Sequence, residues 1–146
     1  MRHGDPLSPL LFCLAEDVLS RSISKLVEED KLELIKGTRH TSVPSHTFYV
    51  DDIMIFCKGK LSGLNNLKDL FQWYALNSGQ VINCSKSTIF YNSISTKRLN
   101  RVVQLLNFSI GTFPFNYLGV PIFKGKPKAS YLQPIAYKIC MKPSSW

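Results

Sequence analysis

Two adjacent carboxylates, Asp51 and Asp52, are the residues of this sequence best suited to chemistry. They stand between two short β-prone runs, residues 46–50 and 53–57, and this pattern predicts a hairpin with an acidic tip. Phosphoryl transfer commonly uses two divalent ions about 3.5–4 Å apart, and Mg²⁺ prefers oxygen ligands. An Asp-Asp pair alone is weak evidence, because acidic residues also favour ordinary turns. The apolar residues on both sides favour the metal-binding interpretation.

The residues before this hairpin predict a long helix. Apolar side chains recur at helical spacing between Leu11 and Val27, so we expect a helix from Ser8-Pro9 to about Lys31. Ser8 is the expected N-cap and Pro9 the first helical residue. A strand is expected at residues 32–35, followed by a polar loop at residues 37–45.

The residues after the hairpin predict two more helices and further strands. One helix is expected over residues 62–78, with Ser62 as N-cap and Gly79 directly after its end. Another is expected up to residue 106, with Ser95 or Thr96 as N-cap and Asn107 at its end. Residues 87–91 predict a strand, residues 113–123 an irregular hairpin, and the proline-containing tail from Lys124 no regular element. The class is α+β, an antiparallel sheet with helices on one face.

Composition bounds the function without fixing it. A chain of 146 residues with 45% hydrophobic residues forms one domain with a real core. Its net charge of +8 favours an anionic partner such as nucleic acid, although a basic domain without such a partner fits equally. Four widely spaced cysteines without a C-x-x-C pair argue against a zinc or redox site and suggest a reduced, intracellular protein. No apolar run approaches the roughly 20 residues that span a bilayer.

Four sequence blocks resemble those of the reverse transcriptases of non-LTR (LINE-type) retrotransposons, especially the plant kind. They occur in the family's order and cover the chain to about Lys128. The blocks are Arg2-His3-Gly4-Asp5-Pro6-Leu7-Ser8-Pro9, Tyr49-Val50-Asp51-Asp52, Gly79 through Asn83 to Lys86-Ser87, and Tyr117-Leu118-Gly119-Val120-Pro121-Ile122.

The resemblance implies a role for each block. Asp51 and Asp52 would be catalytic metal ligands, with Asp51 the principal one. Gly4, Asp5 and Lys86 would lie near the incoming nucleotide, although Lys86 also fits a solvated surface lysine. The hairpin that grips the primer would contain three further residues, Tyr117, Leu118 and Gly119.

The resemblance also implies a fold, a reaction and partners. The fold would be a partial polymerase palm over residues 1–128, with a truncated thumb or irregular tail at residues 129–146. The intact family performs RNA-directed DNA synthesis with Mg²⁺ as cofactor and with an RNA template, a DNA primer and deoxynucleotides as partners. The resemblance also implies a nuclear or cytoplasmic location and no membrane association. It leaves the oligomeric state undetermined.

Two departures from the family bear on activity. The family carries a further metal-binding aspartate on a strand well before the Gly4-Asp5-Pro6 block, and this sequence does not contain it. We therefore expect metal affinity and geometry to fail in the chain alone, which makes it inactive by itself. His3 also stands where the family usually has glutamine. Two alternatives remain: a working polymerase part completed by another chain, and a basic nucleic-acid-binding module without catalysis.

Overall fold

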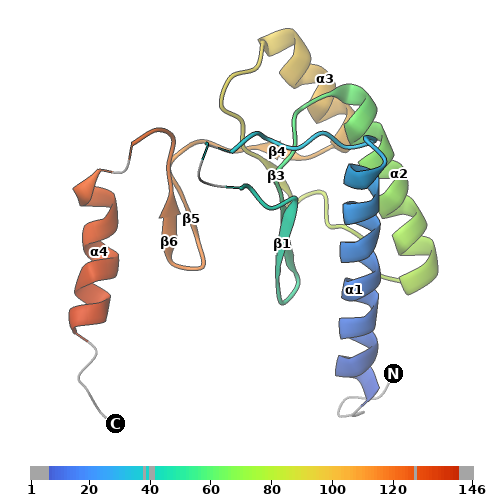
Figure 1. Cartoon of the computed structure of the whole chain (residues 1–146), viewed down its shortest axis with the longest axis horizontal. Coiled ribbons are helices and arrows are strands. Elements are labelled where there is room, and N and C mark those ends of the chain that lie inside the picture. The colour runs from blue at the N-terminus through green and yellow to red at the C-terminus, as the bar shows by residue number, and fades with distance from the viewer. Residues whose placement is uncertain (1–6, 38, 40–41, 127, 142–146) are drawn as a thin grey trace.

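A computed structural model describes residues 7–37, 39, 42–126 and 128–141 of the protein. Helices α1 and α2 lie together at one end of the molecule, the β1–β2 hairpin lies beside them, and α4 stands apart at the other end (Figure 1). In chain order the elements are α1 (Leu7–Glu28), β1 (His46–Tyr49), β2 (Asp52–Ile55), α2 (Leu61–Ser78), β3 (Thr88–Ile89), α3 (Thr96–Leu106), β4 (Ser109–Ile110), β5 (Phe115–Tyr117), β6 (Val120–Ile122) and α4 (Ala129–Cys140).

The core lies where α1 and α2 pack together beneath the β1–β2 hairpin. Leu19 and Ile23 of α1 are fully buried. Partly buried side chains of the hairpin pack against the same cluster, so the acidic hairpin rests directly on the core. Leu67 and Tyr74 of α2 and Leu32 of the loop after α1 complete the buried cluster.

Helix α1 buries only part of the apolar residues that predict it: Ile23 is fully buried, and Leu26 and Val27 pack against the core. The predicted helix is confirmed, but Leu11, Leu14 and Val18 are exposed, at 48%, 55% and 45%. The buried stripe runs through Leu19 and Ile23, because only that side of the helix faces α2 and the hairpin. The helix already includes Leu7, so Ser8 lies in its first turn and is not the N-cap.

Helices α2 and α3 match their predicted ranges closely, and both end as expected. Gly79 after α2 has a φ of 74° and Asn107 after α3 has a φ of 56°, and these left-handed residues close the helices. The expected N-cap of α2 is wrong, because Lys60 and not Ser62 occupies that position. Ser95 is the N-cap of α3 as expected, but its side chain makes no capping hydrogen bond.

The strands form three separate pairs within the described residues, and the α+β class is confirmed. β1 pairs with β2 and β5 with β6, both antiparallel, whereas β3 and β4 are parallel. The parallel pair arises because α3 is the crossover between its two strands. Gly111 follows β4, where an added Cβ would lie 2.3 Å from a ring atom of Phe90. The strand expected at residues 32–35 is reduced to one bridge, between Leu34 and Cys57.

The carboxyl-terminal part contains the hairpin predicted at residues 113–123, seen as β5–β6, and a helix that the sequence did not predict. Phe90 stacks on Phe115 of β5 with ring centroids 3.6 Å apart, which ties the β5–β6 hairpin to the β3 region. Residues 129–140 form α4 despite Pro134 inside it, so the expectation of an irregular tail there is wrong. Phe123 and Tyr131 stack between β6 and α4, with centroids 5.4 Å apart. This contact shows that α4 is held through side chains of the preceding hairpin.

All four cysteines are free thiols, and Cys13 and Cys140 are exposed. No helix within the described ranges is both long and apolar enough to cross a bilayer.

Candidate active site

The β1–β2 hairpin turns through two residues and places both candidate carboxylates at its end. Tyr49 pairs with Asp52 as the last pair of the ladder, so Val50 and Asp51 form the turn. Val50 has a φ of 52° and is 68% exposed. A β-branched residue is unfavourable at positive φ, where a turn of this kind favours glycine. The turn therefore holds strained backbone beside Asp51.

The base of the hairpin is fixed to α1 by a polar contact. The Nε2 atom of His46 lies 2.8 Å from the hydroxyl of Ser20, and its Nδ1 atom lies 2.8 Å from the hydroxyl of Ser45. Burial lowers the pKa of His46, so the ring stays neutral at pH 7. Phe48 and Ile53, a cross-strand pair, pack on the core on the same side. The acidic tip is thus carried by an anchored base.

The two carboxylates have different neighbours. Both are exposed, and neither forms an ion pair or a side-chain hydrogen bond with a described residue. The charge of Asp51 raises the pKa of Glu16 of α1, whereas the charge of Asp52 raises the pKa of Tyr117 of β5. One acid therefore influences a residue of α1 and the other a residue of the second hairpin.

Glu16 is a site residue that sequence reasoning missed. Burial raises the pKa of its carboxyl, and the charge of Asp51 raises it further. Its Oε2 atom is buried without a hydrogen-bond partner in the described structure. A signal was available, because Glu16 is three and seven residues before the buried Leu19 and Ile23 and so shares their face of α1. An acid on a core-facing stripe marks a candidate functional position.

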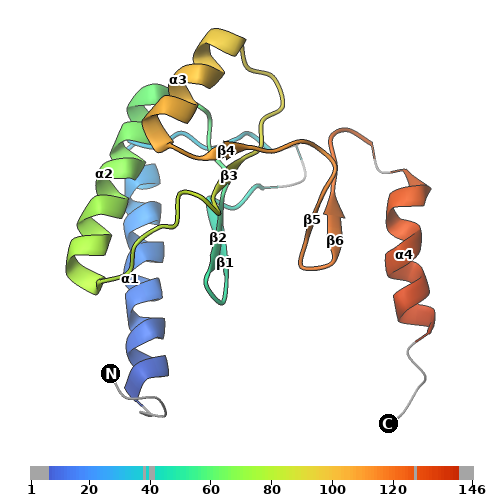
Figure 2. The ribbon, with the colours of Figure 1, turned by 180° about the vertical axis from the view of Figure 1, so that it is seen from behind.

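The β5–β6 hairpin contains the predicted primer-contacting residues, and Tyr117 lies near enough to Asp52 for the charge of that acid to act on its pKa. Tyr117 pairs with Val120, and Leu118 and Gly119 form the turn with φ values of 52° and 79°. Burial is the largest cause of a raised pKa at Tyr117, and the charges of Asp52 and Tyr49 raise this pKa further. The phenol therefore stays protonated at pH 7. The two hairpins point in the same direction, with both turns downward in Figure 2.

Of the other predicted site residues, only Lys86 lies within the described part of the chain. Lys86 is exposed and has no ion pair with a described residue. It sits in a turn that Asn83 closes, since the Asn83 Oδ1 atom accepts hydrogen bonds from the backbone N–H groups of Ser85 and Lys86 at 3.1 and 3.2 Å. Gly4 and Asp5, like His3, lie outside the described residues.

The donor atoms at the tip suit a hard divalent cation. Asp51 and Asp52 offer carboxylate oxygens free of competing partners among the described residues, and a Mg²⁺ ion keeps several waters or phosphate oxygens besides its protein ligands. Within the described ranges no cluster of three or more His, Cys, Asp and Glu side chains could hold a metal ion.

Comparison with known proteins adds the family. A family model described as reverse transcriptase (RNA-dependent DNA polymerase) matches residues 1–122. The match includes both hairpins and stops before α4. No solved structure matches the chain. The acidic β1–β2 turn and the β5–β6 hairpin with Tyr117 both lie within this match. The chain belongs to the reverse transcriptase (RNA-dependent DNA polymerase) family.

Proposed function

We propose that this chain is the palm part of a non-LTR (LINE-type) retrotransposon reverse transcriptase. Asp51 and Asp52 would hold Mg²⁺ for nucleotidyl transfer to a primer end. The observation that carries the proposal is the two-residue turn that presents both carboxylates, exposed and unpaired within the described structure, from a hairpin anchored on the core. The match over residues 1–122 supports the general reaction.

Each side of the hairpin has a separate part in this proposal. Bound Mg²⁺ supplies activation of the attacking hydroxyl and neutralisation of the leaving pyrophosphate. Tyr117 is proposed to place a neutral hydroxyl near Asp52, and the Leu118-Gly119 turn to present backbone to the primer end. Gly4, Asp5 and Lys86 are proposed to contact the nucleotide.

We propose further that these 146 residues alone have no polymerase activity. Two-ion catalysis needs carboxylates that converge on the ions from more than one element. The acidic turn supplies Asp51 and Asp52 from a single hairpin, and the family's further aspartate strand is expected to supply the rest. The isolated chain is therefore proposed not to extend a primer.

Primer extension with Mg²⁺ tests both statements. The chain is assayed alone and then joined to a polypeptide that supplies the preceding aspartate strand of the same family. Only the joined protein should extend the primer, and Asp51→Asn should lower its rate by on the order of 10³-fold or more, because several kcal/mol of transition-state stabilisation are lost. Asp69→Asn, the same change at an exposed position of α2, is the matched control. Equal extension by the Asp51→Asn and parent proteins would contradict the proposal.

A second function, binding of nucleic acid without catalysis, is favoured by a different observation. The net charge is +8, and several of the cations gather around the start of α3. Salt-sensitive binding without extension, even when the family's other aspartate strand is present, would support this function over the first.

A further inference from the structure

A cavity of about 500 Å³ lies between the start of α2 and the first turns of α3, away from the acidic hairpin. Figure 1 shows α3 and the start of α2 at the end of the molecule opposite the β1–β2 turn. The cavity is open to solvent and is lined by Lys60, Leu61, Ser62, Ser95, Lys97, Arg98 and Arg101. Four of these seven side chains are cationic, and none is acidic.

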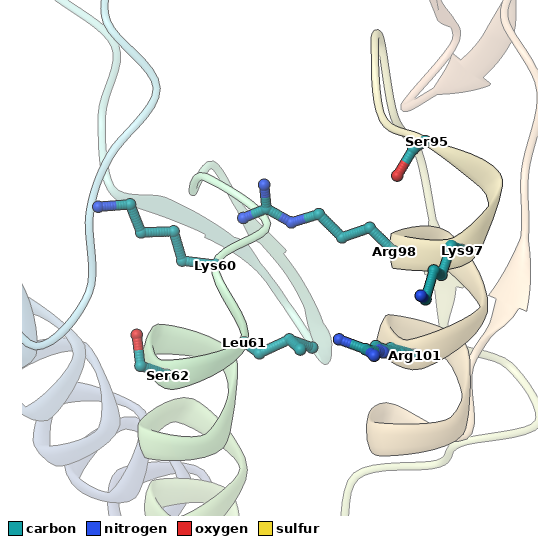
Figure 3. A pocket seen from close by; sticks show the side chains of 7 residues that line it. All are labelled: Lys60, Leu61, Ser62, Ser95, Lys97, Arg98 and Arg101. Atoms are coloured by element: carbon teal, nitrogen blue, oxygen red, sulfur yellow. The ribbon is translucent and has the colours of Figure 1, made fainter.

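The cations are only partly neutralised by the protein. Lys60 forms an ion pair with Glu33, but Lys58 pairs with the same carboxylate at 3.0 Å, so two lysines share one acid. Lys97, Arg98 and Arg101 form no ion pair with any described residue. Figure 3 shows Arg98 and Arg101 extended from α3 toward the start of α2. Arg98 is held there by its Nε–H, which donates to the carbonyl of Gly59 at 2.8 Å.

The arrangement of charge at the start of α3 is unfavourable without an anion. Lys97 and Arg98 occupy the first turn, where the helix dipole disfavours cations, and that turn contains no acid. Lys97 and Arg101 are four residues apart on one helix face, so they repel each other. Neither Ser95 nor Lys60 makes a capping side-chain hydrogen bond, and backbone N–H groups at both helix starts lack such a partner. A bound anion would relieve all three conditions.

We propose that this cavity binds the phosphate backbone of a single RNA strand, at a site separate from the acidic hairpin. An open cavity admits a polymer that passes through it, whereas a small nucleotide is normally held in a more enclosed pocket. The lining has no aromatic side chain on which a base could stack. Contacts are therefore to phosphates and carry little sequence preference. The inference goes beyond the proposed polymerase reaction and does not depend on it.

Fluorescence anisotropy tests the site with the full chain and a labelled oligouridine of about 12 nucleotides, a length within the span of one single-strand site. The assay contains EDTA and no deoxynucleotide, so its result is independent of any polymerase activity. Each phosphate contact adds about 0.7 to the salt dependence of single-strand binding. The double change Lys97→Gln/Arg101→Gln should therefore lower that slope by about 1.4 and weaken binding on the order of tenfold at about 0.1 M salt.

The matched control removes the same charge elsewhere. Lys36 and Lys126 are exposed and form no ion pair with a described residue, and Lys36→Gln/Lys126→Gln should retain most of the affinity. Glutamine is a good helix former, so the α3 variant should keep its helix, which circular dichroism checks. Equal loss of affinity in the two double variants would overturn the proposal, because binding would then follow overall charge alone.

Two further observations decide the ligand and the place. Oligouridine and oligoadenine should bind alike, and amide hydrogen exchange should slow at residues 61–64 and 96–99 when RNA is added. Protection confined to other segments would overturn the placement. Displacement of RNA by a polyglutamate peptide that binds more tightly would overturn RNA as the ligand.

Discussion

The β1–β2 and β5–β6 hairpins both turn through two residues, but they differ in their support. The β1–β2 hairpin rests on fully buried side chains of α1 and is linked to that helix through His46 and Ser20. The β5–β6 hairpin is held by the Phe90–Phe115 stack and by α4, and none of its residues packs against the buried cluster of α1 and α2. Only the first hairpin therefore belongs to the main core.

The hairpins also differ in which residues occupy the positive-φ positions of their turns. Each turn holds one non-glycine residue at a φ of 52°, Leu118 in the second hairpin and Val50 in the first, and Gly119 supplies the other positive φ of the second turn at little cost. Val50 is β-branched, so the better anchored hairpin has the less suitable residue at that φ, directly beside Asp51. Core packing that outweighs local strain is a common arrangement at functional sites.

The largest expected effect concerns the support of the two hairpins. Leu19→Ala removes a fully buried side chain beneath the acidic hairpin and should lower the free energy of unfolding by about 2–5 kcal/mol. Phe115→Ala removes a half-buried stacked ring and should cost about 1–2 kcal/mol. Urea unfolding of both variants measures the difference. A larger loss for Phe115→Ala would show that the second hairpin carries the main core.

A smaller and opposite pair of effects is expected at the turns. Gly119→Ala should lower the free energy of unfolding by about 1 kcal/mol, because alanine is strained at a φ of 79°. Val50→Gly should raise it by up to about 1 kcal/mol, since relief of about 1–2 kcal/mol of left-handed strain exceeds the entropy cost of glycine. Thermal unfolding reports both changes. Shifts of the same sign would contradict the difference between the turns.

The smallest effect distinguishes the neighbours of Asp51 from those of Asp52. The pKa of Glu16 is raised above its ordinary value of 4.5 by burial and by Asp51, so the folded state binds its proton more tightly than the unfolded state. This contribution to stability is present below the ordinary value and is lost as the pH rises through the folded pKa. Glu16→Gln should therefore stabilise the protein at about pH 7 and not at about pH 4.

Thermal unfolding at the two pH values measures this effect. In the same framework, Asp51→Asn should lower the pKa of Glu16 in a carboxyl NMR titration, because one raising charge is removed. Parallel pH dependence in the Glu16→Gln and parent proteins would contradict the assignment.

The sequence predicts those parts whose local signals agree with their packing. The β1–β2 hairpin and the ends of α2 and α3 follow from strand pattern, Gly79 and Asn107, and the structure confirms them. The proximity of Tyr117 to Asp52 required the tertiary fold, because the two residues are 65 positions apart (117 minus 52).

Other features depended on contacts that periodicity does not reveal. Apolar residues lie on both the buried and the exposed side of α1. The positions of α2 and the β1–β2 hairpin decide that Leu19 is buried while Leu14 is exposed. Pro134 argues locally against a helix, yet α4 forms around it and its Tyr131 ring stacks on Phe123. The cationic cavity combines the starts of two helices that are 35 residues apart in sequence (96 minus 61).

The apolar side chains left on the outer stripe of α1 have a practical consequence. Leu10, Leu11, Leu14 and Val18 are each at least 45% exposed and lie within three turns of one helix. A contiguous apolar surface of this kind promotes self-association, which makes apparent melting temperatures depend on protein concentration. Each stability measurement on this chain therefore calls for a dilution series, with the sedimentation coefficient determined at the same concentrations.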